Sequence, residues 1–144
     1  MATYKLKQPS LEDVEVFLKE LHFKVSFQEN VFFEDSRMKN RLALADLREL
    51  GYKSNDRIKF IQQLTAANYF KGPTEDKQNI PEQGDLWEFG MIISSSIKKK
   101  KKGIEYYIKV QLGTPDSNVI CISFHPAEFK IIYPKLHSTK EGSL

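Results

Sequence analysis

Side chains suited to acid–base or phosphate chemistry stand close together near the end of the chain. Tyr107 and Lys109 are two residues apart in Ile104–Leu112, where apolar and polar residues alternate. Successive side chains of a strand point to opposite faces, at a rise of about 3.3 Å per residue. We therefore expect the Tyr107 phenol and the Lys109 ammonium on one face, about 7 Å apart. Both groups can donate hydrogen bonds to a phosphate.

The next stretch, Val119–His125, offers a histidine in the matching pattern. If its bulky apolar residues face the core, its alternate residues join Tyr107 and Lys109 when the two strands pair. An unperturbed histidine has a pKa of about 6.5, which suits proton transfer near neutrality. The alternative is an ordinary solvated face of an antiparallel sheet. The apolar set is Ile120, Ile122 and Phe124, and the alternate set is Cys121, Ser123 and His125.

A run of five lysines separates two predicted strands. Such a run cannot pack in a core, so it predicts a solvated hairpin loop. Lysines that contact phosphates release counterions, and the run is therefore a candidate RNA-binding element. The alternative is a solubilising loop that contacts nothing. The run consists of Lys98, Lys99, Lys100, Lys101 and Lys102.

The single tryptophan, Trp87, stands where a polar loop enters the first long strand. A lone tryptophan most often anchors a core. An exposed one can stack a nucleobase, so Trp87 is also a candidate RNA-binding residue. Its neighbour Glu88 is expected to point to the other face of the strand.

The chain lacks the common signatures of cofactor and metal chemistry. It has no G-x-x-x-x-G-K-[ST], G-x-G-x-x-G or G-x-S-x-G motif. The single cysteine, Cys121, excludes an internal disulfide framework and a multi-cysteine metal site. The three histidines are too scattered for a metal cluster. The sequence therefore predicts no cofactor and no metal.

The first half of the chain predicts three helices. Ser10 is a good N-cap, with Asp13 in the position of a capping box. A second helix is predicted from about Met38 to Leu50, and Gly51 is placed to terminate it. A third begins near Ser54 and fades after Leu64. The first helix carries apolar residues at helical spacing, namely Leu11, Val14, Phe17, Leu18 and Leu21.

Strands dominate the second half. A polar loop is expected over Thr74–Gly84, and Lys71-Gly72-Pro73 ends any helix before it. Helices followed by successive strands predict an α+β domain, with the helices on one face of an antiparallel sheet. The domain is predicted to span 1–133, followed by a flexible tail at 134–144. Val25–Phe33 is expected to form a short strand or an extended arm, and the other predicted strands are Leu86–Ile93, Ile104–Leu112, Val119–His125 and Phe129–Tyr133.

Composition sets outer bounds on the protein. Of 144 residues, 40% are hydrophobic and the net charge is +3, which is typical of a globular protein. The first eight residues lack the apolar stretch of a secretory signal. No segment approaches the roughly 20 apolar residues of a membrane span. We therefore expect a cytoplasmic protein that does not enter a membrane.

Four segments resemble, in order and spacing, the MqsR family of bacterial toxins. The resemblance runs from about residue 37 to residue 129, and the helical stretch Arg41–Gly51 resembles the corresponding helix of that family. No single motif decides the match, and the ordered set carries it. The segments are Asn68–Pro73 (NYFKGP), Asp85–Gly90 (DLWEFG), Tyr107–Lys109 (YIK) and Ile120–His125 (ICISFH).

This resemblance implies a RelE-like fold and a metal-independent endoribonuclease that cleaves messenger RNA and is neutralised by a cognate antitoxin. It places the family's site on Lys71, Glu88, Tyr107 and His125. The family has a glutamine in place of Glu88 and a lysine in place of His125. It also lacks the lysine run. The carboxylate of Glu88 can act as a base or only pair with Lys71.

Together, the residues and the resemblance predict an enzyme in which His125 transfers protons, Lys71 and Lys109 neutralise phosphate charge, and Tyr107 assists. Two other classes of protein fit the same residues. A non-catalytic RNA-binding module would use the same basic face and Trp87 without cutting. In a protein–protein interaction domain, the lysine loop would be only a solubilising hairpin. Such a domain would have negligible affinity for RNA at low salt. The sequence does not define the oligomeric state.

Overall fold

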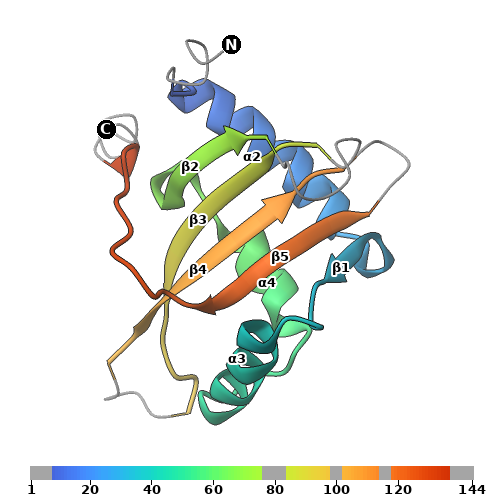
Figure 1. Ribbon diagram of the computed structural model, residues 1–144, viewed down its shortest axis with the longest axis vertical. Coiled ribbons are helices and arrows are strands. Elements are labelled where there is room, and N and C mark those ends of the chain that lie inside the picture. Colours follow the sequence, from blue (N-terminus) through green and yellow to red (C-terminus); the bar gives the residue numbers. More distant parts are fainter. Residues whose placement is uncertain (1–7, 76–83, 98–101, 114–117, 137–144) are drawn as a thin grey trace.

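The computed structural model describes residues 8–75, 84–97, 102–113 and 118–136. In these residues the chain forms a five-stranded sheet in the order β1-β5-β4-β3-β2 (Figure 1). Neighbouring strands from β2 to β5 run antiparallel, whereas β1 runs parallel to β5. The strands are β1 (Val31–Phe33), β2 (Tyr69–Thr74), β3 (Leu86–Ile93), β4 (Ile104–Gln111) and β5 (Val119–Pro126).

The three predicted helices form close to their expected positions. They are α2 (Leu11–Val25), α3 (Met38–Glu49) and α4 (Asp56–Gln63). Ser10 and Asp13 form the predicted capping box, in which each side chain bonds the backbone N–H of the other residue. Gly51 follows α3 with a positive φ, the conformation that favours glycine after a helix.

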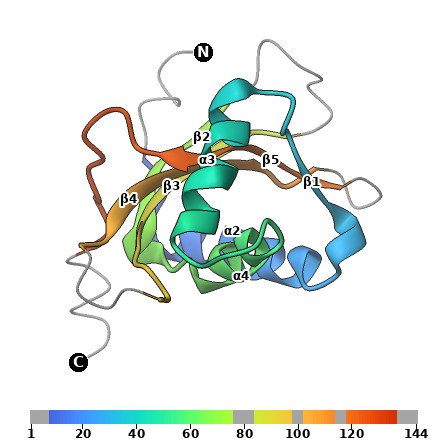
Figure 2. The same cartoon turned by 90° about the horizontal axis from the view of Figure 1, so that it is seen from below.

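The helices do not all lie on one face of the sheet. Helices α2 and α4 cover one face, which we call the helix side (Figure 1). Helix α3 stands across the end of the sheet, with its first turn on the opposite side, the polar face (Figure 2). Its last turn reaches the core, where Leu47 is fully buried. The prediction of an α+β protein is confirmed, but that of a one-sided helix layer is only partly right.

Strand β4 shows the alternation that the sequence predicted. Tyr106, Ile108 and Val110 belong to the core on the helix side and are fully buried. The residues between them therefore face the polar side. Strand β5 pairs with β4 so that His125 stands opposite Tyr107 and Ser123 stands opposite Lys109.

A β-bulge in β5 changes the faces of its first half. Lys109 pairs with Ser123, but the next residue, Val110, pairs with Cys121, so Ile122 is the additional residue. Beyond the bulge the alternation is reversed, and Cys121 lies in the core together with Phe124. The condition under which Cys121 would join Tyr107, with Ile120 and Ile122 facing the core, is therefore not met, and Cys121 is a buried thiol. Strict alternation cannot place two residues three positions apart on one face.

Three further strand predictions need correction. Strand β2 was not predicted, because Gly72 and Pro73 lie within it. It is an edge strand, where a proline is tolerated because its missing N–H donor need not pair with a neighbouring strand. The sheet is mixed and not antiparallel throughout, since β1 runs beside β5 in the same direction. The stretch Phe129–Tyr133 is not a strand.

Instead, residues 127–136, which we call the C-terminal segment, leave β5 and run toward the β2 edge of the sheet (Figure 1). This segment packs closely on Gly90, where an added Cβ would stand 2.6 Å from the Tyr133 hydroxyl and 2.8 Å from Ile131 Cδ1. Glycine is therefore required at this position for the segment to approach the sheet. Of the expected tail at 134–144, residues 137–144 lie outside the described residues.

Candidate functional site

A hollow of about 500 Å³ opens on the polar face, between the first turn of α3 and the C-terminal segment. Strands β4 and β5 form its floor. The prediction that Tyr107, Lys109 and His125 share one face agrees with this geometry. The lining residues are Arg37, Met38, Lys39, Asn40, Tyr107, Lys109, Ser123, His125, Glu128 and Phe129.

Tyr107, in the floor of the hollow, forms a buried pair with Glu88 of the neighbouring strand β3. The Tyr107 hydroxyl donates a hydrogen bond of 2.6 Å to Glu88 Oε1. Both residues are at most 9% exposed. Burial, followed by this hydrogen bond and the negative charge of Glu88, raises the pKa of Tyr107 far above its usual range, and the positive charge of Arg37 opposes the shift. Tyr107 is therefore a neutral phenol at any physiological pH, and its proton is directed at the carboxylate.

His125 lies beside Tyr107, with ring centroids 5.6 Å apart. Its Nδ1 is 2.9 Å from the carbonyl oxygen of Pro126. A carbonyl only accepts, so this contact assigns the proton of the neutral ring to Nδ1. Nε2 then carries a lone pair and can accept a proton. The site thus holds a base next to a neutral phenol.

Positive charge reaches the hollow from two elements. Lys109 is half-buried on β4, with Glu88 and Ser123 as its partners on the neighbouring strands. Arg37 and Lys39 come from the start of α3 and are exposed. Lys39 forms an ion pair of 2.6 Å with Glu128, so its charge is already partnered. Arg37 and Lys109 remain the cations best placed for an anionic ligand.

Sequence reasoning missed the contribution of α3. Asn40 fixes this helix against β5: its amide donates to the carbonyls of Glu34 and Ile122 and accepts from the Phe124 N–H. Only 2% of Asn40 is exposed. One feature of the sequence could have indicated this contribution. The segment that resembles MqsR toxins begins near residue 37, and Arg37 lines the hollow.

Lys71, Trp87 and Lys102 do not line the hollow. Lys71 is exposed on β2, paired in register with Glu88, and its Nζ lies 5.2 Å from the Phe70 ring centroid. Trp87 stacks on Phe17 at 4.2 Å, which places its ring on the helix side. It therefore takes the role of a core anchor and does not lie beside Tyr107. Lys98–Lys101 are outside the described residues, and Lys102 is exposed.

Among the described residues, no group of three or more His, Cys, Asp or Glu side chains is arranged to hold a metal ion. No helix in the same part of the chain is long and apolar enough to cross a membrane. No protein-family model matches the chain, and no curated protein and no solved structure shows significant similarity to it. The inference of function therefore depends on the geometry of the hollow and on the sequence motifs.

Proposed function

We propose that this protein is a metal-independent endoribonuclease with a RelE-like fold, which cleaves messenger RNA in the manner of MqsR-type toxins. The observation that carries the proposal is the state of His125. Its Nδ1 is held by the Pro126 carbonyl, so its Nε2 is left as a base, and the same hollow is lined by two cations, Arg37 and Lys109, and by the neutral phenol of Tyr107. RNA provides its own nucleophile, so one positioned base and a site for the phosphate suffice for cleavage.

The proposed reaction begins at the ribose. His125 Nε2 takes the proton of a 2′-hydroxyl while that oxygen forms a bond to the adjacent phosphorus. The bond from phosphorus to the 5′-oxygen breaks, and its electron pair leaves with that oxygen, which takes a proton from water. The products are a 2′,3′-cyclic phosphate and a 5′-hydroxyl end. His125 then returns its proton to solvent.

The cations stabilise the charge that develops on the phosphate. Lys109 is half-buried, so its charge acts with less screening than that of an exposed lysine. Arg37 offers the planar donor set that suits phosphate oxygens. Lys71 lies outside the hollow and is proposed to contact the phosphate of a neighbouring nucleotide. The Tyr107 proton is engaged by Glu88, so Tyr107 positions the site and is not its acid.

The resemblance to MqsR toxins supports the remaining parts of the proposal. A cognate antitoxin would neutralise the protein, and both would act in the cytoplasm. Co-expression with the product of a small neighbouring reading frame tests this partnership. Recovery of a stable complex, together with relief of growth arrest, would support it.

The decisive experiment is cleavage in EDTA. Purified protein is incubated with a structured messenger RNA, and the ends of the products are mapped. We expect cutting to survive EDTA and to leave 2′,3′-cyclic phosphate or its hydrolysis product. Products with 5′-phosphate ends, or strict dependence on Mg²⁺, would contradict the mechanism.

A non-catalytic RNA-binding module is the second candidate. It is favoured by the Tyr107–Glu88 pair, because a phenol whose proton is engaged by a carboxylate does not serve as an acid for the leaving oxygen. Such a module would bind the same RNA without cutting it. End mapping therefore separates the two candidates, and negligible RNA affinity at low salt would exclude both.

A further inference from the structure

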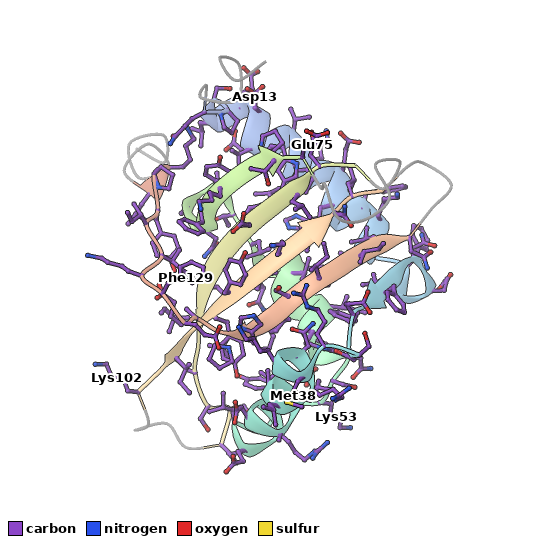
Figure 3. The ribbon with its side chains drawn as sticks, viewed as in Figure 1. Asp13, Met38, Lys53, Glu75, Lys102 and Phe129 are labelled. Atoms are coloured by element: carbon purple, nitrogen blue, oxygen red, sulfur yellow. The ribbon has the colours of Figure 1, made fainter. Side chains whose placement is uncertain are left out.

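The rim of the hollow carries an exposed aromatic ring that the cleavage reaction does not use. Phe129 lies in the C-terminal segment and is 48% exposed, although it lines the hollow beside Tyr107 and His125. Figure 3 shows it on the side of the C-terminal segment, with Met38 of α3 on another side of the site. Met38 is 64% exposed. Apolar groups thus stand at the rim above a polar and cationic floor.

The Phe129 ring is held in place by its neighbours. It meets the Tyr107 ring edge to face, with centroids 5.1 Å apart and an interplanar angle of 68°. On another side it contacts Phe70 at 5.8 Å. These contacts order the ring before any ligand arrives, so little side-chain entropy remains to be lost on binding. An ordered and half-exposed ring is a stacking platform.

The charged groups of the hollow determine which kind of molecule would stack on the Phe129 ring. Arg37 and Lys109 supply positive charge within the same hollow, and His125 stands next to Tyr107. A ligand that combines a flat apolar group with a nearby anion matches this arrangement. A nucleotide is such a ligand, and in single-stranded RNA its base is free to leave the strand and stack on an aromatic side chain.

Resting on the proposed function, we propose that the hollow binds an unpaired nucleobase of RNA against the Phe129 ring, which makes the substrate single-stranded RNA. The sugar and phosphate next to that base then reach Lys109 and His125. Paired bases are stacked within a duplex and cannot reach the ring. Phe129 is thus a binding residue that selects unpaired RNA.

Binding is measured with a single-stranded 2′-O-methyl oligonucleotide, which lacks the 2′-hydroxyl nucleophile and cannot be cleaved by the proposed reaction. We expect Phe129→Ala and Phe129→Leu to weaken its binding by about 5- to 150-fold, as for one stacked base. Phe129→Tyr, which keeps the ring, should bind within about twofold of the wild type. The same oligonucleotide annealed into a duplex should bind weakly to every variant.

Phe32 provides a matched control, because it is also 48% exposed but lies on β1 and does not line the hollow. Phe32→Ala should leave binding unchanged. Equal affinity of Phe129→Ala and wild type would overturn the proposal, as would equal binding of duplex and single strand. A loss shared by Phe32→Ala would also overturn it. Thermal melting identifies any variant that fails to fold. If Phe129→Ala does not fold, the binding affinity of the more conservative Phe129→Leu variant tests the proposal.

The cleavage proposal fails independently of this one. If the protein binds the oligonucleotide through Phe129 but never cuts natural RNA, the proposed base site stands and the proposed cleavage activity is wrong. If the protein cuts RNA but the Phe129→Ala and Phe129→Leu variants bind the oligonucleotide normally, the cleavage activity stands and the proposed base site is wrong.

Discussion

On the helix side of the sheet, Phe89 and Phe124 are completely buried among other apolar residues. Their immediate neighbours in sequence, Glu88 and His125, lie on the polar face and are 9% and 8% exposed. Residues on the two faces can therefore be almost equally hidden, but the contents of the faces differ. One is filled by rings in contact, and the other by hydrogen-bonded polar groups around a hollow.

This difference shows that the polar face is not the ordinary solvated side of an antiparallel sheet. A buried polar group costs free energy unless it is hydrogen-bonded, so such a layer is not favoured by packing alone. Here Tyr107 is hydrogen-bonded to Glu88, and His125 is hydrogen-bonded to the carbonyl oxygen of Pro126. They are covered by the C-terminal segment and by the start of α3. We therefore expect substitutions on the two faces to alter different properties.

The largest expected effect concerns His125 on the polar face. His125→Gln should lower the rate of RNA cleavage by about 10²- to 10⁴-fold, the usual worth of a positioned proton-transfer group. RNA affinity and thermal stability should barely change. His125→Asn, which places an amide near the position of Nδ1, controls for the Pro126 contact. Unchanged cutting by both variants would remove His125 from the mechanism, and loss of folding would make it structural.

A substitution on the helix side should have the opposite signature. Phe89→Ala removes a fully buried ring and should lower the free energy of unfolding by about 3–5 kcal/mol. Urea denaturation measures this loss. Cleavage per folded molecule should remain close to that of the wild type. A loss of cleavage without a loss of stability would mean that the two faces are not separate in function.

Tyr107→Phe tests the hydrogen bond between Tyr107 and Glu88 on the polar face. The ring stays packed, but Glu88 loses its hydrogen-bond donor, and a bond to a charged group is worth about 1.5–3 kcal/mol. We expect a stability loss in that range and a smaller fall in cleavage than for His125→Gln. Adding Glu88→Gln should recover part of the stability, because the buried negative charge is then gone. A double variant no more stable than Tyr107→Phe would argue against this account.

The core also predicts a response to alkaline pH. Burial raises the pKa of the Cys121 thiol from 9.0 to about 12, and it raises the pKa of Tyr69 and Tyr106 from 10.0 to about 12. Between these values the unfolded chain loses protons that the folded chain keeps, so the free energy of unfolding should fall as pH rises from 9 to 12. Cys121→Ala should flatten the decline between pH 9 and 10. An identical decline in that variant would exclude Cys121 as a cause.

The smallest effect on the folded state is expected for the lysine run. Replacing Lys98–Lys102 with serines should weaken RNA binding and flatten its dependence on salt, with the melting temperature nearly unchanged. Affinities measured over a range of salt concentrations give the slope. An unchanged slope would show that these lysines do not contact the RNA backbone.

The sequence by itself determined the main elements and the shared face of Tyr107 and Lys109. These follow from local rules: the alternation along β4 has a period of two, and Ser10 with Asp13 caps a helix whatever lies elsewhere. The same rules failed for Cys121, because a single bulged residue reverses the alternation, and only pairing with β4 shows where it occurs.

Tertiary structure alone decided the walls of the hollow. Arg37 enters it because Asn40 fixes α3 to β5, a contact between residues more than 80 positions apart. Phe129 enters it because its segment turns back over Gly90 and does not continue as a strand. Both placements depend on long-range packing between elements whose own sequences do not specify a partner. Periodicity assigns a residue to a face, but only the assembled fold determines which other segment covers that face.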